Sequence, residues 1–164
     1  MNLVRSACLA VALVLSSGAA ATAQDLDRGM EALEAGDYAA ALEVWRPLAE
    51  VGNEQAQFFI AIMYFGGLGV LQDYVETVKW CRLAAEQGFA ECQGALGELY
   101  ENGHGVPQDN VKAHMWYNIA GANGASKRNE DRDEIAKEMT AADISQAQAM
   151  ARECMSSGYV DCGW

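Results

Sequence analysis

Cysteine is the residue type in this chain whose side chain is most able to do chemistry, and histidine is the next. The sequence has five cysteines and two histidines. A redox-active centre needs a Cys-x-x-Cys or similarly close pair, which the sequence lacks, and neither histidine has zinc-ligand spacing to a cysteine. We therefore favour structural disulfides for these cysteines, with a zinc site as the alternative, and we expect neither a metal nor a cofactor.

The sequence predicts no enzyme. It contains no nucleophile–base pattern and no phosphate-binding loop that follows a strand, because its glycine-rich segments join one predicted helix to another. We interpret His104 and His114 as tolerated variation between two copies of a repeat rather than as catalytic bases.

Residues 1–23 have the pattern of a secretory signal peptide. Arg5 precedes the apolar run 7–15, and the small residues Ala21-Thr22-Ala23 fit a cleavage site that would leave Gln24 first. The apolar run is short for a bilayer span, which needs roughly 20 residues. We therefore expect a periplasmic or secreted protein with no membrane insertion after cleavage. An uncleaved anchor is the alternative.

Cleavage would remove Cys8 and leave an even number of cysteines, which in an exported chain indicates disulfides. Four cysteines allow three pairings, and the sequence alone does not choose among them. We favour a bond between Cys81 and Cys92, which lie on either side of a predicted helix–helix turn, and a bond between Cys154 and Cys162.

The chain is acidic, with a formal net charge of −12. Phosphate backbones and anionic lipids repel such a chain, so we expect no binding to nucleic acid. A protein partner with a basic or apolar segment fits the charge better. The alternative is that the charge only keeps the domain soluble.

An internal repeat positions these residues. Residues 66–73 read Gly-Gly-Leu-Gly-Val-Leu-Gln-Asp, and 36 positions later residues 102–109 read Asn-Gly-His-Gly-Val-Pro-Gln-Asp. Trp80 and Trp116 share this offset, and we predict that both pack in the core between units. A period of this length is typical of stacked helical repeats.

One unit consists of a helix, a glycine loop and a second helix. Apolar residues in 53–65 follow helical spacing, the glycines of 66–69 break that helix, and Asp73 and Asp109 are placed as N-caps. We therefore predict an all-α fold, a right-handed α-α superhelix (solenoid) of stacked helix-loop-helix repeats.

After the signal peptide we predict a single domain, residues 24–164. It comprises an atypical first unit (37–52), two clear repeats (53–88 and 89–124), and capping helices with a cysteine tail (125–164).

The second repeat carries a specific pattern. Residues 96–109 read Leu-Gly-x-x-Tyr-x-x-Gly-x-Gly-Val-x-Gln-Asp, and four further positions continue it: Ala113, Trp116, Tyr117 and Ala120. This pattern resembles the Sel-one-like repeat (SLR) family, which is related to the tetratricopeptide (TPR) repeats. The resemblance covers residues 37–124. It implies a non-enzymatic adaptor of the bacterial envelope that binds a protein partner through its concave face.

The resemblance also bears on the cysteines and on other functions. The exported, cysteine-containing branch of the family places a disulfide across each helix pair. Cys92 matches the later cysteine of that arrangement, whereas Cys81 lies one helical turn before the usual partner position, near Ala85. A purely structural component of an envelope complex is one alternative function. A β-lactam-binding enzyme or modulator is another, for which the sequence shows no serine–lysine pair.

Helical geometry predicts which side chains contact the partner. Successive helical residues are about 100° apart, so three apolar residues of 53–65 project away from the core face, beside three acidic residues of the next repeat. The alternative is that the opening helices, residues 25–51, cover the two phenylalanines. The six predicted partner-binding residues are Phe58, Ile62, Phe65, Glu91, Glu98 and Glu101.

Overall fold

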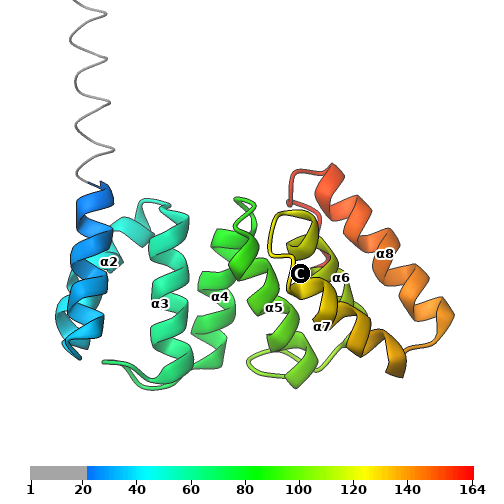
Figure 1. The fold of residues 1–164 in the computed structure, drawn as a ribbon, viewed down its shortest axis with the longest axis horizontal. Coiled ribbons are helices and arrows are strands. Elements are labelled where there is room, and N and C mark those ends of the chain that lie inside the picture. Colours follow the sequence, from blue (N-terminus) through cyan, green and yellow to red (C-terminus); the bar gives the residue numbers. More distant parts are fainter. Residues whose placement is uncertain (1–21) are drawn as a thin grey trace, which may run out of the picture.

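The computed structural model describes residues 22–164, and the predicted signal peptide lies almost entirely outside this range. The described part is a row of stacked helices (Figure 1). Within it, none of the helices is both long and apolar enough to cross a bilayer. A first helix covers residues 22–34. The elements that follow are α2 (Tyr38–Glu50), α3 (Glu54–Gly66), α4 (Tyr74–Ala85), α5 (Ala90–Asn102), α6 (Asn110–Ala122), α7 (Arg128–Ile135), the 3-10 helix η1 (Ala136–Glu138) and α8 (Ala141–Ser156).

The two clear repeats share the same turn and cap chemistry. Asp73 accepts hydrogen bonds from two backbone amides in the first turn of α4, and Asp109 accepts one from the Lys112 amide in the first turn of α6, which confirms both predicted N-caps. The preceding helices end at Gly67 and Gly103, both in the left-handed region with φ of 66° and 67°. The backbone of the second loop also packs closely on α4. A Cβ atom on Gly105 would lie 2.3 Å from a backbone carbonyl oxygen of α4.

A buried glutamine links each repeat to the unit before it. The Gln93 side-chain amide donates to the carbonyl oxygen of Ala85 at the end of α4 (3.2 Å) and accepts from the Asn123 amide beyond α6 (2.7 Å). Gln57 makes the matching two bonds one repeat earlier, at 3.1 and 2.9 Å. Both glutamines are buried, so each bond is made where an unpaired polar group would be costly.

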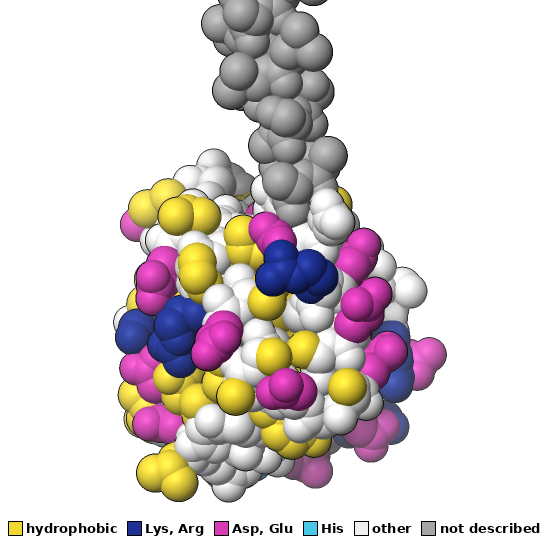
Figure 2. All heavy atoms as spheres, turned by 90° about the vertical axis from the view of Figure 1, so that its left-hand side faces the viewer, with side chains coloured by type: hydrophobic (Ala, Val, Ile, Leu, Met, Phe, Trp, Pro, Cys, Tyr) yellow, Lys and Arg dark blue, Asp and Glu magenta, His cyan; other side chains and the backbone are white. Residues whose placement is uncertain are grey.

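Tryptophans occupy the core between units. Trp80 and Trp116 are 7% and 0% exposed, which confirms their predicted place in the core. In the first unit Trp45 is also buried, and its indole N–H donates to the backbone oxygen of Leu26 (3.3 Å). The first helix and α2 thereby close one end of the row. Figure 2 shows the molecule from this end, with acidic side chains lying among basic and apolar ones.

The other end is closed by α7, η1, α8 and the residues that follow α8. We call these last residues, 157–164, the closing segment. This segment returns over the second repeat, where the ring centroid of Trp164 lies 5.0 Å from that of Trp116. The predicted bond between Cys154 and Cys162 is present, and it ties the closing segment to α8.

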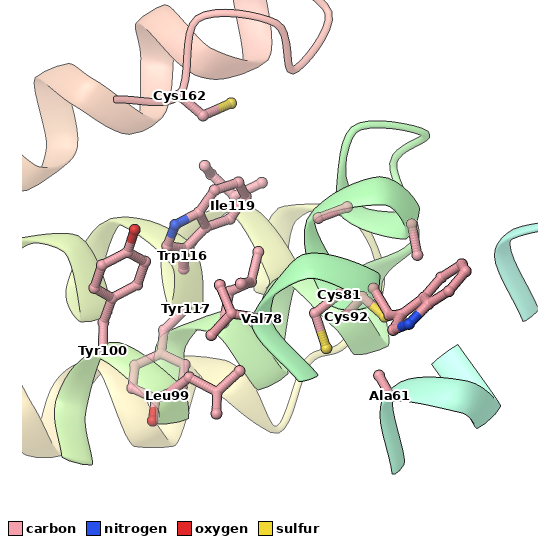
Figure 3. Packing of buried hydrophobic residues seen from close by; sticks show 14 of the residues in the cluster. Ala61, Val78, Cys81, Cys92, Leu99, Tyr100, Trp116, Tyr117, Ile119 and Cys162 are labelled. Carbon is pink, nitrogen blue, oxygen red and sulfur yellow. The ribbon is translucent and has the colours of Figure 1, made fainter. Parts of the chain in front are cut away.

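The predicted bond between Cys81 and Cys92 is not formed, and this part of the prediction is corrected. Both residues are free, buried cysteines that lie next to each other on α4 and α5 (Figure 3). A hydrogen bond with Cys81, together with burial, raises the pKa of Cys92. Cys81 stands seven residues before Gly88 and Cys92 four residues after it, so the pair is not symmetric about the turn, whereas a disulfide needs closely facing Cβ atoms.

Replacing Gln93 with methionine tests the glutamine link. Methionine keeps a similar length and volume but leaves the Ala85 carbonyl oxygen and the Asn123 amide without their partner. We expect the free energy of unfolding in urea to fall by about 1–3 kcal/mol, the usual cost of a buried unsatisfied group. The control is Gln55→Met at an exposed position of α3, which should change little. Equal effects from the two variants would contradict the structural role of Gln93.

Candidate protein-binding site

A hollow of about 260 Å³ opens between α3 and α5, on the side formed by the first helices of the repeats. Cys81 of α4 and Arg128 of α7 also line it. The predicted partner-binding residues other than Glu101 come together here. The lining residues are Phe58, Ala61, Ile62, Phe65, Thr77, Cys81, Glu91, Ala95, Glu98, Leu99, Ala125 and Arg128.

The hollow exists because the two repeats differ at two positions. In the second repeat Tyr117 of α6 fills the corresponding space, and a Cβ atom on Gly97 would lie 2.5 Å from its ring. In the first repeat the same positions hold Cys81 and Ala61, both buried. A cysteine is much smaller than a tyrosine, so the first repeat leaves open space where the second is packed. Figure 3 shows Tyr117, Cys81 and Ala61 in their respective places.

The apolar wall of the hollow belongs to α3. Phe58 is half-buried and packs on Phe89, with ring centroids 5.5 Å apart. Ile62 and Phe65 are 37% and 43% exposed, which is high for such large apolar side chains. The opening helices therefore leave Phe65 exposed, contrary to the alternative that they cover both phenylalanines, whereas Phe58 is half-buried.

The opposite rim is charged. Arg128 forms ion pairs with Glu98 and with Asp131, the latter at 2.9 Å. Burial by itself lowers the pKa of Arg128, but the bonds to these two carboxylates raise it overall, so the guanidinium stays charged. Glu91 is exposed and forms no ion pair within residues 22–164. The rim thus has one cation already held by two carboxylates and one carboxylate that is unpaired.

Glu101 does not join the other predicted residues. Its carboxylate accepts a hydrogen bond from the Tyr117 hydroxyl, and it lies in a separate polar depression beside Gln108 and Glu134. Burial and the bond to Glu101 raise the pKa of Tyr117. Glu101 lies apart from the hollow because the tyrosine that fills the second repeat engages its carboxylate.

Arg128 is the charged lining residue that we did not predict from the sequence. Its side chain crosses the surface of α5 at Gly94, where a Cβ atom would lie 2.5 Å from the Arg128 Nε. A signal for it exists in the sequence. Continuing the 36-residue period makes α7 the first helix of a third unit. In the second unit, Gly94 replaces the bulky Phe58 of the first. A glycine there allows another side chain to approach closely.

The two histidines have different surroundings. His104 stacks on Tyr74, with ring centroids 4.4 Å apart. His114 is buried on α6, and its Nδ1 has no hydrogen-bond partner among the described residues. Burial, and then the nearby Arg132, lower the pKa of His114, so its imidazole is neutral at neutral pH. Residues 22–164 contain no cluster of His, Cys, Asp or Glu side chains that could hold a metal ion.

Comparisons with known proteins agree with this architecture. The family model described as the Sel1 repeat matches residues 54–89 and 90–124. The solved structure of c5321, a protective antigen present in uropathogenic Escherichia coli strains that displays an SLR fold, is similar, with 28% identity and a TM-score of 0.78. The match covers 84% of this chain but 31% of c5321, so the chain spans less than a third of that protein.

A second solved structure is similar over nearly its whole length. It is a Sel1 repeat protein from Oxalobacter formigenes, with 32% identity and a TM-score of 0.62. The match covers 74% of this chain and 96% of that protein. No curated protein matches the chain in sequence.

The variant His114→Val tests whether His114 is buried in its neutral form. Valine is the residue at the equivalent position of the first repeat, Val78. The pKa of His114 is lowered in the folded state, so as the pH falls below about 6.5 the unfolded chain takes up a proton that the folded chain does not. The free energy of unfolding should therefore fall between about pH 7.5 and 5.5, and this dependence should be weaker in the variant.

The measurement is urea unfolding at several pH values. His104→Leu, which removes the chain's other histidine at a half-buried position, is the matched control. An unchanged pH dependence in His114→Val would contradict the role assigned to His114.

Proposed function

Since the chain belongs to the Sel1 repeat family, whose members are generally protein–protein interaction modules, we propose that it is an adaptor of the bacterial envelope that binds a protein partner in the hollow between α3 and α5. The observation that carries the proposal is the open hollow itself. The second repeat packs the equivalent space with Tyr117, whereas the first leaves it bordered by exposed apolar side chains. Open apolar surface rimmed by charge is typical of protein-binding sites.

The rim indicates the chemistry of the partner. Ile62 and Phe65 offer apolar contact, while Glu91 is a carboxylate without an ion-pair partner in the described part of the chain. Arg128 is already held by Glu98 and Asp131, so it adds little attraction for an acidic partner. These contacts favour a protein segment with an apolar side chain next to a lysine or arginine.

The proposed location is the periplasm or the outside of the cell. Two observations support it. Residues 1–23 have the pattern of a signal peptide, and the bond between Cys154 and Cys162 is of a kind that persists in oxidising compartments. A purely structural part of an envelope complex would share this location, but it would hold its partner at constant stoichiometry rather than bind and release it.

The test is to place a photo-crosslinking residue at Ile62 or at Phe65 in cells and to identify the captured protein by mass spectrometry. We expect the same protein from both positions. A crosslinker at Leu71, which is 90% exposed on a loop outside the hollow, is the control and should not capture it. Capture of one protein equally from all three positions would contradict binding in the hollow.

A double variant then closes the hollow by copying the second repeat. Cys81→Tyr with Ala61→Gly installs in the first repeat the tyrosine and glycine that pack together in the second as Tyr117 and Gly97. We expect capture from Ile62 to fall about tenfold or more, because the partner loses its buried contact area. A thermal melt checks that the variant folds, and undiminished capture by a folded variant would refute the proposal.

A further inference from the structure

A second open site lies on the edge where the helices turn, between the α2–α3 turn and the end of α4. It shares no lining residue with the hollow between α3 and α5, so binding at this edge would not depend on the proposed function. Its lining residues are Ala49, Glu50, Val51, Gly52, Gln57, Trp80, Leu83, Glu86 and Gln87.

The repeat reproduces the framework of this site 36 residues later. Gln57 and Gln93 each donate to a carbonyl oxygen in the last turn of the preceding helix, and each accepts from a side-chain amide, that of Gln87 in the first case and Asn123 in the second. The turn glycine and the tryptophan recur on the same offset. The corresponding pairs are Gly52 with Gly88, Gln57 with Gln93, Trp80 with Trp116, and Gln87 with Asn123.

In the later copy the protein fills the site with its own closing segment. The ring of Tyr159 lies over Gly88, within 3.2 Å of where a Cβ atom would stand, and its hydroxyl donates to the Asn123 side-chain oxygen (3.0 Å). Trp164 packs against the Trp116 ring at 5.0 Å. The structure therefore displays the kind of ligand that this framework accepts, which is a short segment folded in turns that carries two aromatic side chains.

In the earlier copy the same positions are open. No heavy atom lies within 4 Å of a Cβ placed on Gly52, and within residues 22–164 no group donates to the Gln87 side-chain oxygen. The indole N–H of Trp80 is buried without an acceptor in the described chain. Val51 and Leu83, which border the site, are 83% and 39% exposed.

From this correspondence we infer that the earlier copy is a second protein-binding site, which takes a short segment with aromatic side chains in the way that the later copy holds the closing segment. The chain's own closing segment is not available to it, because the bond between Cys154 and Cys162 ties that segment to α8.

Charge adds a condition on the occupant. The exposed residues Glu50 and Glu86 flank the site, whereas the equivalent residues of the later copy are Glu86 and Ala122. The earlier copy thus has an additional carboxylate. The occupant is therefore an aromatic segment that also carries a lysine or arginine.

The probe is a fluorescein-labelled peptide that copies residues 156–164 with C162S and D161K, titrated with the full-length, disulfide-bonded protein and followed by fluorescence anisotropy. We expect saturable binding that Leu83→Lys and Val51→Lys each weaken by about tenfold. Both residues are exposed, so both variants should fold, and Leu71→Lys at another exposed apolar position is the control.

Two changes in the peptide sharpen the test. Replacing both of its aromatic residues with alanine should abolish binding, and restoring Asp161 should weaken binding at low salt more than at high salt. Absence of saturable binding up to about 1 mM would overturn the inference. It would also be overturned if Leu83→Lys and Val51→Lys bound as tightly as the unmodified protein, since the peptide would then occupy another surface, such as the one held by the closing segment.

Discussion

The structure depends on one repeated interaction, the buried glutamine that bonds to the end of the preceding helix. Gln57 and Gln93 each join three chain segments, namely their own helix, a carbonyl oxygen in the last turn of the helix before it, and a side chain beyond the helix after it. Hydrophobic contact alone is non-directional and allows helices to slide. A buried hydrogen bond prevents such sliding, because any shift of one helix along the other leaves buried polar groups unpaired. The glutamines therefore set the spacing between units.

On this regular frame, differences in side-chain size decide which surfaces are open. Tyr117 packs one repeat, while the smaller Cys81 leaves the other hollow. Similarly, the site between a helix–helix turn and the end of the next helix is covered in the later copy by Tyr159 and Trp164 and is open in the earlier copy. Neither open surface needs a departure from the fold. The protein obtains distinct surfaces from a repeated backbone by changing what fills each copy.

Features that arise from local or periodic patterns could be predicted from the sequence. The caps at Asp73 and Asp109 depend on the residues that immediately follow them, and the core tryptophans recur with the period. Features that depend on contacts between units could not be predicted in this way. The engagement of Glu101 by Tyr117 requires knowing which way a ring points across two helices.

The same limit applies to the cysteines and to Arg128. Their places on either side of one turn predicted that Cys81 and Cys92 lie close together but did not decide whether they bond, since that depends on how their Cβ atoms face each other across α4 and α5. The period and Gly94 indicate that a side chain approaches α5 there, but the reach of Arg128 across Gly94 depends on how α7 docks, and α7 no longer carries the repeat's sequence pattern.

The pairing of Gly97 with Tyr117 also constrains the order in which such a repeat can change over evolutionary time. If an alanine replaced Gly97 first, its methyl group would press on the tyrosine ring, and overpacking of this kind costs about 1–3 kcal/mol. If the tyrosine shrank first, the change would leave a depression that water can enter, and the alanine could follow without a clash. A lineage that opens a closed repeat should therefore lose the tyrosine before the glycine, and one that closes an open repeat should gain the glycine first.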